Sequence, residues 1–446
     1  MFRPGNHDNK TVEELTACVI DYGTFLALAD KLAETYKTVY YYCPIEKEFK
    51  SIADASIGEG LDGVKKIHDF LDPDIFNTID LFIFPDIGYG GLQKYLRSIG
   101  KAVWGAMGAD ELELFRDLFL ETLEKVKLPT PDSKVIYGLT ALGKYLKVVK
   151  NKWVKINCFR GDMETWYHIN YDYSIRTLES LAVIFGGVKE QITFVVQETI
   201  DSEVEVGYDG WCIDGNYPSK SFQGYEKKNE LYLGTVLSND NLPEEIKYVN
   251  EKMSPVLKEY GYRSWWSTEI RVDKEGTPYF IDPTTRHPAL CGEHQWETCS
   301  NLAEIIWAGA HGDVIEPEFE FTFAASATLH YKSYEPMTDS RVILKEWKSL
   351  EVPKDVIRWF KPYHYCIVGE IYHFVPSKMD EVGVVIGVGS SIKESIDHLK
   401  KNLESMSKLP VWTNISDFPE LVKSIITAKD KGIKFAKDIP DPKSLL

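Results

Sequence analysis

The chain has 446 residues, of which 44% are hydrophobic and 13% aromatic, so it can bury sizeable cores and its length predicts roughly two to four domains. Its net charge of −17 disfavours a general nucleic-acid or anionic-membrane binder, because both partners attract positive surfaces. Seven dispersed cysteines form no Cys-x-x-Cys pair, and the sequence has neither a signal pattern nor a long apolar run, so we expect a cytoplasmic protein without a disulfide framework or membrane anchor.

Short apolar runs alternate with helical patterns over the first 105 residues. This rhythm predicts a parallel sheet with crossover helices, and therefore an α/β domain over residues 1–105. The predicted strands cover 17–22, 38–43, 80–85 and 102–104, and the predicted helices cover 24–36 and 90–99.

The middle of the chain, residues 106–317, predicts two subdomains with a cleft between them, because a small α/β piece precedes a larger antiparallel piece. From residue 318 to 446 the pattern becomes β-rich and aromatic, followed by an amphipathic helix and a polar tail. The elements predicted for the middle region are helices over 110–126, 140–150 and 243–260, strands over 152–157, 191–198 and 204–213, and a hairpin over 264–288.

Lys155 stands inside the apolar strand Trp153-Val154-Lys155-Ile156, where an unpaired ammonium would be costly to bury. A phosphate group is a natural partner for it, although an edge-strand lysine that reaches solvent fits the pattern as well. The loop that follows contains Gly161, and exposed backbone amides in such a loop can close over phosphates.

A strand predicted to end at Gln197-Glu198-Thr199-Ile200 would expose unpaired backbone groups at a hinge. Such groups can bind the edge of an adenine ring while an acidic side chain receives ribose hydroxyls. An ordinary strand-turn-strand corner would give the same pattern.

Glu269 and Asp282 lie on the two arms of the predicted hairpin, on either side of the turn Asp273-Lys274-Glu275-Gly276. Loops of two or four residues bring the two carboxylates to one face, whereas a three-residue loop without a bulge separates them. Two converging carboxylates need a cation, and an all-oxygen set suits magnesium. A solvated hairpin with scattered charges is the alternative.

Taken together, Lys155, the Gly161 loop, the hinge at Glu198 and the hairpin with Glu269, Asp282 and Arg286 resemble the ATP-grasp superfamily of carboxylate ligases. The overall plan is most similar to that of the phosphoribosylamine–glycine ligases. The resemblance implies an N-terminal Rossmann-like pre-ATP-grasp domain, an ATP-grasp domain and a β-rich C-terminal domain, in a mixed α/β and α+β chain.

The resemblance also implies roles for individual residues. Lys155 would contact the α- and β-phosphates, Gly161 and Lys220 would lie near the phosphates, and Glu205 would reach the ribose or the metal-linked network. Arg286 would stabilise an acyl-phosphate intermediate. The remaining implied contacts are the adenine and ribose hinge of Gln197, Glu198, Thr199 and Ile200, and the magnesium or manganese ligands Glu269, Asp282 and Thr284.

The sequence therefore predicts an ATP-dependent ligase that joins a small carboxylate to a small amine, and it is compatible with a homo-oligomer. The run Asp282-Pro283-Thr284-Thr285-Arg286 stands where the family has Glu-x-Asn-x-Arg, so a nucleotide-binding protein without ligase activity is the alternative. A third hypothesis is an enzyme that joins a small amine or acid to a macromolecule; the negative charge disfavours a nucleic acid and leaves peptides open. His287 and His294 follow the motif and are interpreted either as substrate contacts or as structural residues.

Overall fold

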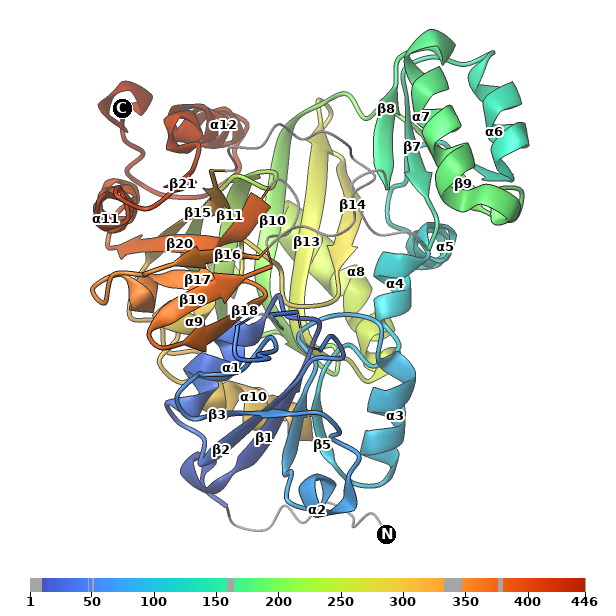
Figure 1. Cartoon of the computed structure of the whole chain (residues 1–446). Helices are drawn as coiled ribbons and strands as arrows, with labels where there is room; N and C mark the ends of the chain where they lie inside the picture. Colours follow the sequence, from blue (N-terminus) through green and yellow to red (C-terminus); the bar gives the residue numbers. More distant parts are fainter. Residues whose placement is uncertain are drawn as a thin grey trace.

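Five parallel strands form a sheet at the N-terminal end of the chain (Figure 1). In the computed structural model, which describes residues 10–46, 48–49, 52–158, 164–332, 347–375 and 380–445, their order is β3-β2-β1-β4-β5. Both faces of the sheet are buried, since Val19 belongs to one core with α1 and α10 while Ile20 belongs to another with α2 and α3. These elements are β1 (Thr16–Ile20), α1 (Leu26–Ala33), β2 (Thr38–Tyr42), β3 (Val64–Ile67), α2 (Pro73–Phe76), β4 (Leu81–Ile83), α3 (Gly90–Ser98), β5 (Ala102–Trp104) and α10 (Leu302–His311).

A four-stranded antiparallel sheet with two helices forms a small lobe that projects from the rest of the chain (Figure 1). Val154 and Phe194 on one face of this sheet pack against the helices, while Lys155 and Gln197 lie on the other face. The lobe consists of β6 (Ser133–Tyr137), α6 (Leu139–Leu146), β7 (Lys152–Ile156), β8 (Thr165–His168), α7 (Tyr171–Phe185) and β9 (Thr193–Glu198), in the strand order β6-β9-β7-β8.

The largest sheet runs through the middle and C-terminal regions of the chain. Its order is β14-β13-β10-β11-β12-β15-β20-β17, with β21 paired to β15, so it continues across residue 317 through the pairing of β12 with β15. Helix α8 (Glu244–Tyr260) packs against β10 and β13. The strands are β10 (Ser202–Ile213), β11 (Lys220–Lys227), β12 (Leu231–Ser238), β13 (Arg263–Asp273), β14 (Pro278–Thr284), β15 (Phe323–Tyr331), β17 (Phe360–Pro362), β20 (Glu381–Gly389) and β21 (Val411–Trp412).

The C-terminal region adds a small sheet and two long helices beside the large sheet. Helix α11 packs on β20 and β15, and α12 packs on β10 and β11. None of the helices within the described ranges has the length and apolar character needed to cross a membrane. The elements here are β16 (Lys348–Leu350), β18 (Tyr365–Val368), β19 (Ile371–Phe374), α11 (Ile392–Ser405) and α12 (Phe418–Asp430), and the short α9 (Gln295–Thr298) precedes them in the middle region.

The predicted helix over 110–126 is wrong as a single element. It is divided into α4 (Asp110–Leu114) and α5 (Arg116–Lys125) by Phe115, whose backbone is extended (φ −105°, ψ 95°). Its amphipathic pattern continues through the break, so periodicity alone could not reveal it. Buried polar contacts of Glu113 and Arg116, described below, accompany the break.

The strands β11 and β12 are absent from the sequence-based prediction. Glycines at 224 and 234 interrupt the alternation of apolar and polar residues that predicts a strand. Both positions are glycine because the ring of Tyr232 lies over them. A Cβ atom at Gly224 would lie 2.1 Å from that ring, so only glycine fits there.

Candidate functional site

A bulge in the hairpin brings Glu269 and Asp282 to the same face of the large sheet. Next to the turn Val272 pairs with Pro278, a register that would set Glu269 opposite Ile281 and turn Asp282 to the other face. The register shifts by one residue between Ile270 and Glu269, and Glu269 then pairs directly with Asp282. The two carboxylates therefore share a face through a bulge rather than through the loop lengths that the sequence analysis favoured.

Cavity A, of about 550 Å³, lies between the small lobe and this hairpin. Lys155 reaches it from β7, and its ammonium donates a hydrogen bond to the carbonyl of the bulged residue Ile281 at 3.1 Å. The other predicted residues that line cavity A are Gln197, Glu198, Ile200, Glu205, Glu269 and Asp282.

Acidic and basic side chains both line cavity A, and burial shifts the pKa values of two of them. Burial raises the pKa of Glu269, and the nearby carboxylates of Glu205 and Asp282 raise it further. Burial lowers the pKa of Lys155, with Arg116 acting in the same direction, while Asp282 and Glu269 act against it. Without a ligand, both groups are therefore easier to neutralise than in water.

Two residues from the α4–α5 break hold the end of the hairpin. Arg116, which is buried, forms an ion pair with Asp282. Glu113, also buried, accepts hydrogen bonds from the Thr285 backbone at 2.9 Å and from Nε of Arg286 at 3.0 Å. The geometry of the predicted metal motif thus depends on a segment more than 150 residues earlier in the chain.

Cavity B, of about 580 Å³, adjoins cavity A and contains the predicted catalytic residue. Arg286 lines it together with Thr284, Glu269 and Asp282. The ion pair with Glu113 raises the pKa of Arg286 against the opposing effect of burial, so the guanidinium stays charged there.

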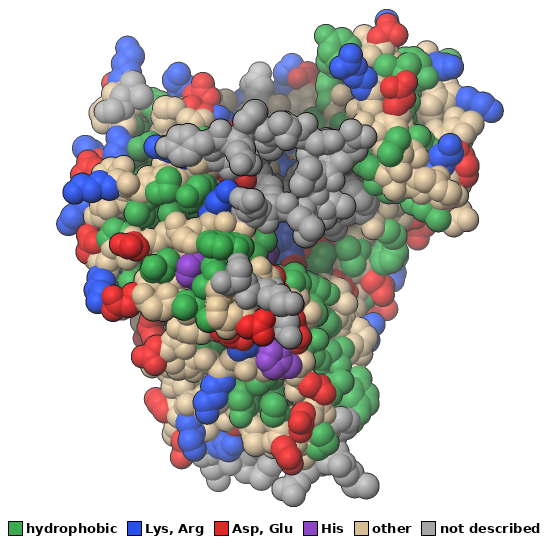
Figure 2. Space-filling model, in the orientation of Figure 1, with side chains coloured by type: hydrophobic (Ala, Val, Ile, Leu, Met, Phe, Trp, Pro, Cys, Tyr) green, Lys and Arg blue, Asp and Glu red, His purple; other side chains and the backbone are tan. Residues whose placement is uncertain are grey.

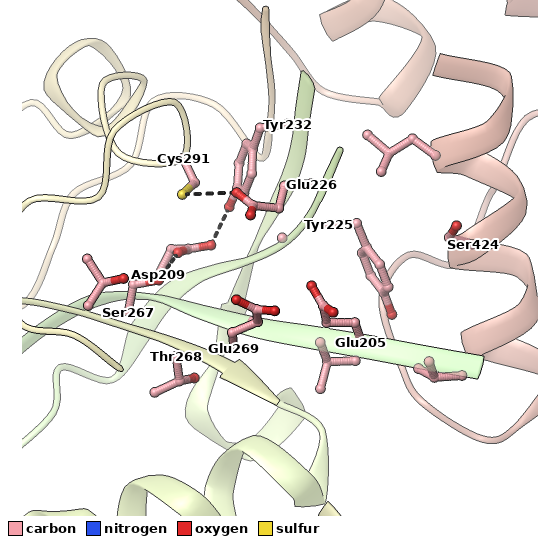
Figure 3. A pocket seen from close by; sticks show the side chains of 16 residues that line it. Glu205, Asp209, Tyr225, Glu226, Tyr232, Ser267, Thr268, Glu269, Cys291 and Ser424 are labelled. Carbon is pink, nitrogen blue, oxygen red and sulfur yellow. Dashed lines mark hydrogen bonds between the residues drawn. The ribbon is translucent and has the colours of Figure 1, made fainter. Parts of the chain in front are cut away.

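Cavity C, of about 250 Å³, also borders Glu269 (Figure 3). Its walls come from β10, β11 and β13, and Leu421 and Ser424 of α12 close one end. Glu226 and Glu269 line cavities A, B and C, so the three spaces meet at these two carboxylates.

Several predicted residues lie outside the cavities. Thr199 is exposed and donates to the carbonyl of Asn151 at 3.0 Å. Lys220 lies at the opposite end of β11 from Lys227, about 23 Å away at ~3.3 Å per residue, so it is not brought to the predicted phosphate region. Gly161 lies outside the described residues.

The two histidines that follow the motif are buried in aromatic surroundings. The ring of His287 lies 4.7 Å from that of Trp265, and the ring of His294 stacks on Tyr232 at 5.0 Å. Burial lowers the pKa of both, so they are neutral core residues, as the structural interpretation holds.

Sequence reasoning missed four charged residues of the site: Glu113, Arg116, Glu226 and Lys228. Glu226 lies at the end of β11 and Lys228 in the turn that follows it, within the run Glu-Lys-Lys-Asn-Glu. The charge cluster was a signal, but the strands on either side of the turn were unrecognised. Glu113 and Arg116 gave no signal, because charged residues on an amphipathic helix usually face solvent.

The residues at Glu269 and Asp282 fit a divalent cation. Glu269 receives no hydrogen bond or ion pair from the part of the chain that the structure describes, and other carboxylates surround it. Within the described ranges no three His, Cys, Asp or Glu side chains form a complete metal site. Magnesium, which often takes one or two carboxylates and completes its shell with phosphates and water, matches this partial set.

Solved ATP-grasp ligases resemble this structure over most of its length. Phosphoribosylamine–glycine ligase from Thermotoga maritima has a TM-score of 0.63 at 16% identity, covering 90% of this chain and 98% of that one. The biotin carboxylase domain of 2-oxoglutarate carboxylase from Hydrogenobacter thermophilus, in complex with MgADP, has a TM-score of 0.60 at 14% identity, covering 95% and 96%. For the L-amino acid ligase from Bacillus licheniformis the TM-score is 0.57 at 14% identity, covering 91% and 99%.

The chain therefore has the ATP-grasp fold, which confirms the predicted fold class. In its overall plan it is similar to phosphoribosylamine–glycine ligase, as the sequence predicted. No protein-family model matches the sequence, and neither does any curated protein sequence.

Proposed function

We propose that the chain is an ATP-dependent ligase that joins a carboxylate to an amine through an acyl phosphate. The observation that carries the proposal is the meeting of Lys155 with Glu269 and Asp282 across cavity A, in a chain of ATP-grasp fold. Lysine on one lobe and carboxylates on the other suit a triphosphate and a divalent ion between them.

In this proposal the nucleotide occupies cavity A. Its base lies against Gln197, Glu198 and Ile200, with Thr199 in the same hinge, and Glu205 receives the ribose. Lys155 contacts the phosphates, and the loop of Gly161 closes over them. Lys228, which lines cavity A, is a better candidate for the second phosphate-binding lysine than Lys220.

Glu269 and Asp282 would hold magnesium, or manganese in its place, with Thr284 beside them. When bound, the ion neutralises phosphate charge and orients the triphosphate. Arg116 already shares Asp282, so Glu269 is the carboxylate with more capacity for the ion.

The reaction would proceed in cavity B. An oxygen of the substrate carboxylate attacks the γ-phosphorus and ADP leaves. The amine, made neutral by passing one proton to a carboxylate such as that of Glu226, then attacks the carbonyl carbon. The carbon–oxygen bond to phosphate breaks, and the leaving phosphate takes the second proton from the nitrogen. Arg286, fixed by Glu113, donates to the oxygen that gains charge. Most of the rate enhancement would come from positioning and electrostatics, since phosphoryl transfer needs little covalent help.

The test measures ADP release from MgATP with a panel of small carboxylates, with hydroxylamine as a general amine. Arg286→Ala should lower turnover about 10²–10³-fold, the effect of ~2.7–4 kcal/mol that removal of one such donor has. Its far-UV spectrum and unfolding temperature show whether the variant is folded. Full turnover by Arg286→Ala would contradict the role of this residue.

The ion pair between Arg116 and Asp282 favours one second candidate, a nucleotide-binding protein without turnover. Because the carboxylate of Asp282 is engaged by Arg116, it is less available to a metal ion, and the proposed metal site is weaker. Tight MgATP binding with no ADP release across a broad panel of acids and amines would favour this second function over the ligase.

A further inference from the structure

Carboxylates line all three cavities, but the cavities differ in whether cations stand beside them. Among the described residues, cavity A is lined by Lys155, Lys227, Lys228 and Arg271, and cavity B by Lys228 and Arg286. Both therefore offer cations to phosphates and carboxylates. No described lysine or arginine lines cavity C.

The charged side chains that line cavity C are four carboxylates (Figure 3): Glu205, Asp209, Glu226 and Glu269. Asp209 is buried and fixed, since it accepts hydrogen bonds of 2.7 Å from both Ser267 Oγ and the Tyr232 hydroxyl. Burial raises the pKa of Asp209 to about 6, against the effect of these two bonds. Burial, together with nearby carboxylates, also raises the pKa of Glu226 to about 7 and that of Glu269 to about 8. A cation in cavity C would favour the ionised form of all of these acids.

The shape of cavity C comes from a separation of two strands. β10 pairs with β11 only where Gly207–Asp209 face Phe222–Gly224, although β10 pairs with β13 along most of its length. Beyond Gly207 the strands part, and Glu205 and Glu226 line the opening. No side chain fills the place above Gly207, where a Cβ atom would meet only backbone oxygens, the nearer at 3.1 Å.

The hydroxyl of Tyr225, like the side chain of Glu269, is a polar group in the wall of cavity C without a partner among the described residues. Tyr225 lines the cavity and is only 5% exposed, and its hydroxyl makes no hydrogen bond with any described residue. A buried hydroxyl without a partner is costly, so a bound molecule with a polar hydrogen or lone pair would stabilise this wall.

We infer that cavity C binds the positively charged amino group of a small amine, which in the proposed ligase is the second substrate. The part about a substrate rests on the proposed function; the binding itself does not. Cavity C meets cavity B at Glu226 and Glu269, so an amine held in C lies next to the space assigned to the acyl phosphate. A volume of about 250 Å³ equals roughly eight waters of ~30 Å³, enough for a small amine.

The inference is tested by the binding of ethylamine and 1,4-diaminobutane, with ethanol and 1,4-butanediol as neutral counterparts, followed by NMR without nucleotide or magnesium. The amines should bind the wild-type chain at least tenfold more tightly than the alcohols. Asp209→Asn, which changes a carboxylate of cavity C alone, should weaken the amines at least tenfold. Glu381→Gln is the matched control, because Glu381 lines cavity B alone, and it should change their affinity less than threefold.

Ser424→Phe gives a test that leaves every carboxylate in place. Ser424 is exposed at the α12 end of cavity C, so a phenyl ring there should block the space without disturbing the core. Equal binding of amines and alcohols, equal losses in Asp209→Asn and Glu381→Gln, or full amine binding by Ser424→Phe would overturn the inference. Because none of these measurements needs turnover, a failure of the ligase proposal would be seen separately.

Discussion

At the scale of single residues, Asp282 interacts with two cationic side chains, Arg116 and Lys155. Arg116 forms an ion pair with it, and Lys155 lies close enough that Asp282 raises the lysine's pKa. Glu269, the paired carboxylate, has no such partner in the described part of the chain. An arginine can therefore supply part of the charge balance that a second carboxylate would otherwise require from a metal ion.

Asp209 allows a prediction about pH and stability. Its pKa is about 6 in the folded chain and near 3.9 when unfolded, so the folded state is favoured below about pH 4 and loses that advantage as pH rises through 6. Asp209→Asn cannot ionise. The free energy of unfolding of Asp209→Asn minus that of wild type should therefore increase by up to about 3 kcal/mol between pH 4 and pH 7.5, measured by urea denaturation. A constant difference between the two proteins over this range would show that Asp209 does not titrate as stated.

At the scale of elements, the bulge at Ile281 allows a second prediction. Insertion of one alanine between Ile281 and Asp282 should set the alanine opposite Glu269, so that Asp282 turns to the other face of the sheet. The insertion should abolish binding of a magnesium–nucleotide analogue, measured by calorimetry. Ile281→Ala keeps the register, the bulge and its carbonyl, so it should bind the analogue within a few-fold of wild type. Retained binding after the insertion would contradict the need for both carboxylates on one face.

Local signals in the sequence were enough to predict much of the fold. The glycine at 276 (φ +84°) turns the hairpin, and Gly261 in the left-handed region (φ +67°) ends α8 where the periodicity stops. Four of the five parallel strands were equally clear as short apolar runs, whereas β3 was missed because two of its four residues are lysines. Lys155, Glu269 and Asp282 line one cavity, as the motif order suggested.

The features that sequence reasoning missed depend on contacts between distant segments. The break at Phe115 accompanies the bonds that Glu113 and Arg116 make to the hairpin, which no local pattern encodes. Lys220 was placed near the phosphates by resemblance alone, and Lys228 was not considered. β11 was not recognised, and without its register the two ends of the strand could not be distinguished. The bulge is likewise a one-residue shift that hydrophobic alternation hides.

At the scale of the whole molecule, a net charge of −17 repels anions, so an anion-binding site needs a local group of cationic side chains. They come from two lobes: Lys155 from β7 of the small lobe, Arg271 from β13 of the large sheet, and Lys228 from the turn that joins β11 to β12. The surface in Figure 2 carries charges of both signs, without one dominant basic patch on the face shown. A triphosphate in cavity A would therefore contact both lobes at once.

This arrangement predicts that a nucleotide stabilises the molecule through Lys155. At 100 times its Kd, a magnesium–ATP analogue should raise the free energy of unfolding by about 2.7 kcal/mol. Loss of a charge-assisted hydrogen bond costs ~1.5–3 kcal/mol, so at the same concentration Lys155→Ala should keep only about 1 kcal/mol of that gain. Lys220→Ala is the matched control: it removes the same charge from the far end of β11 and should keep the full increase, measured as a rise in unfolding temperature. If Lys220→Ala lost the increase and Lys155→Ala kept it, the phosphates would lie at the other end of β11 and the nucleotide would have to be moved out of cavity A.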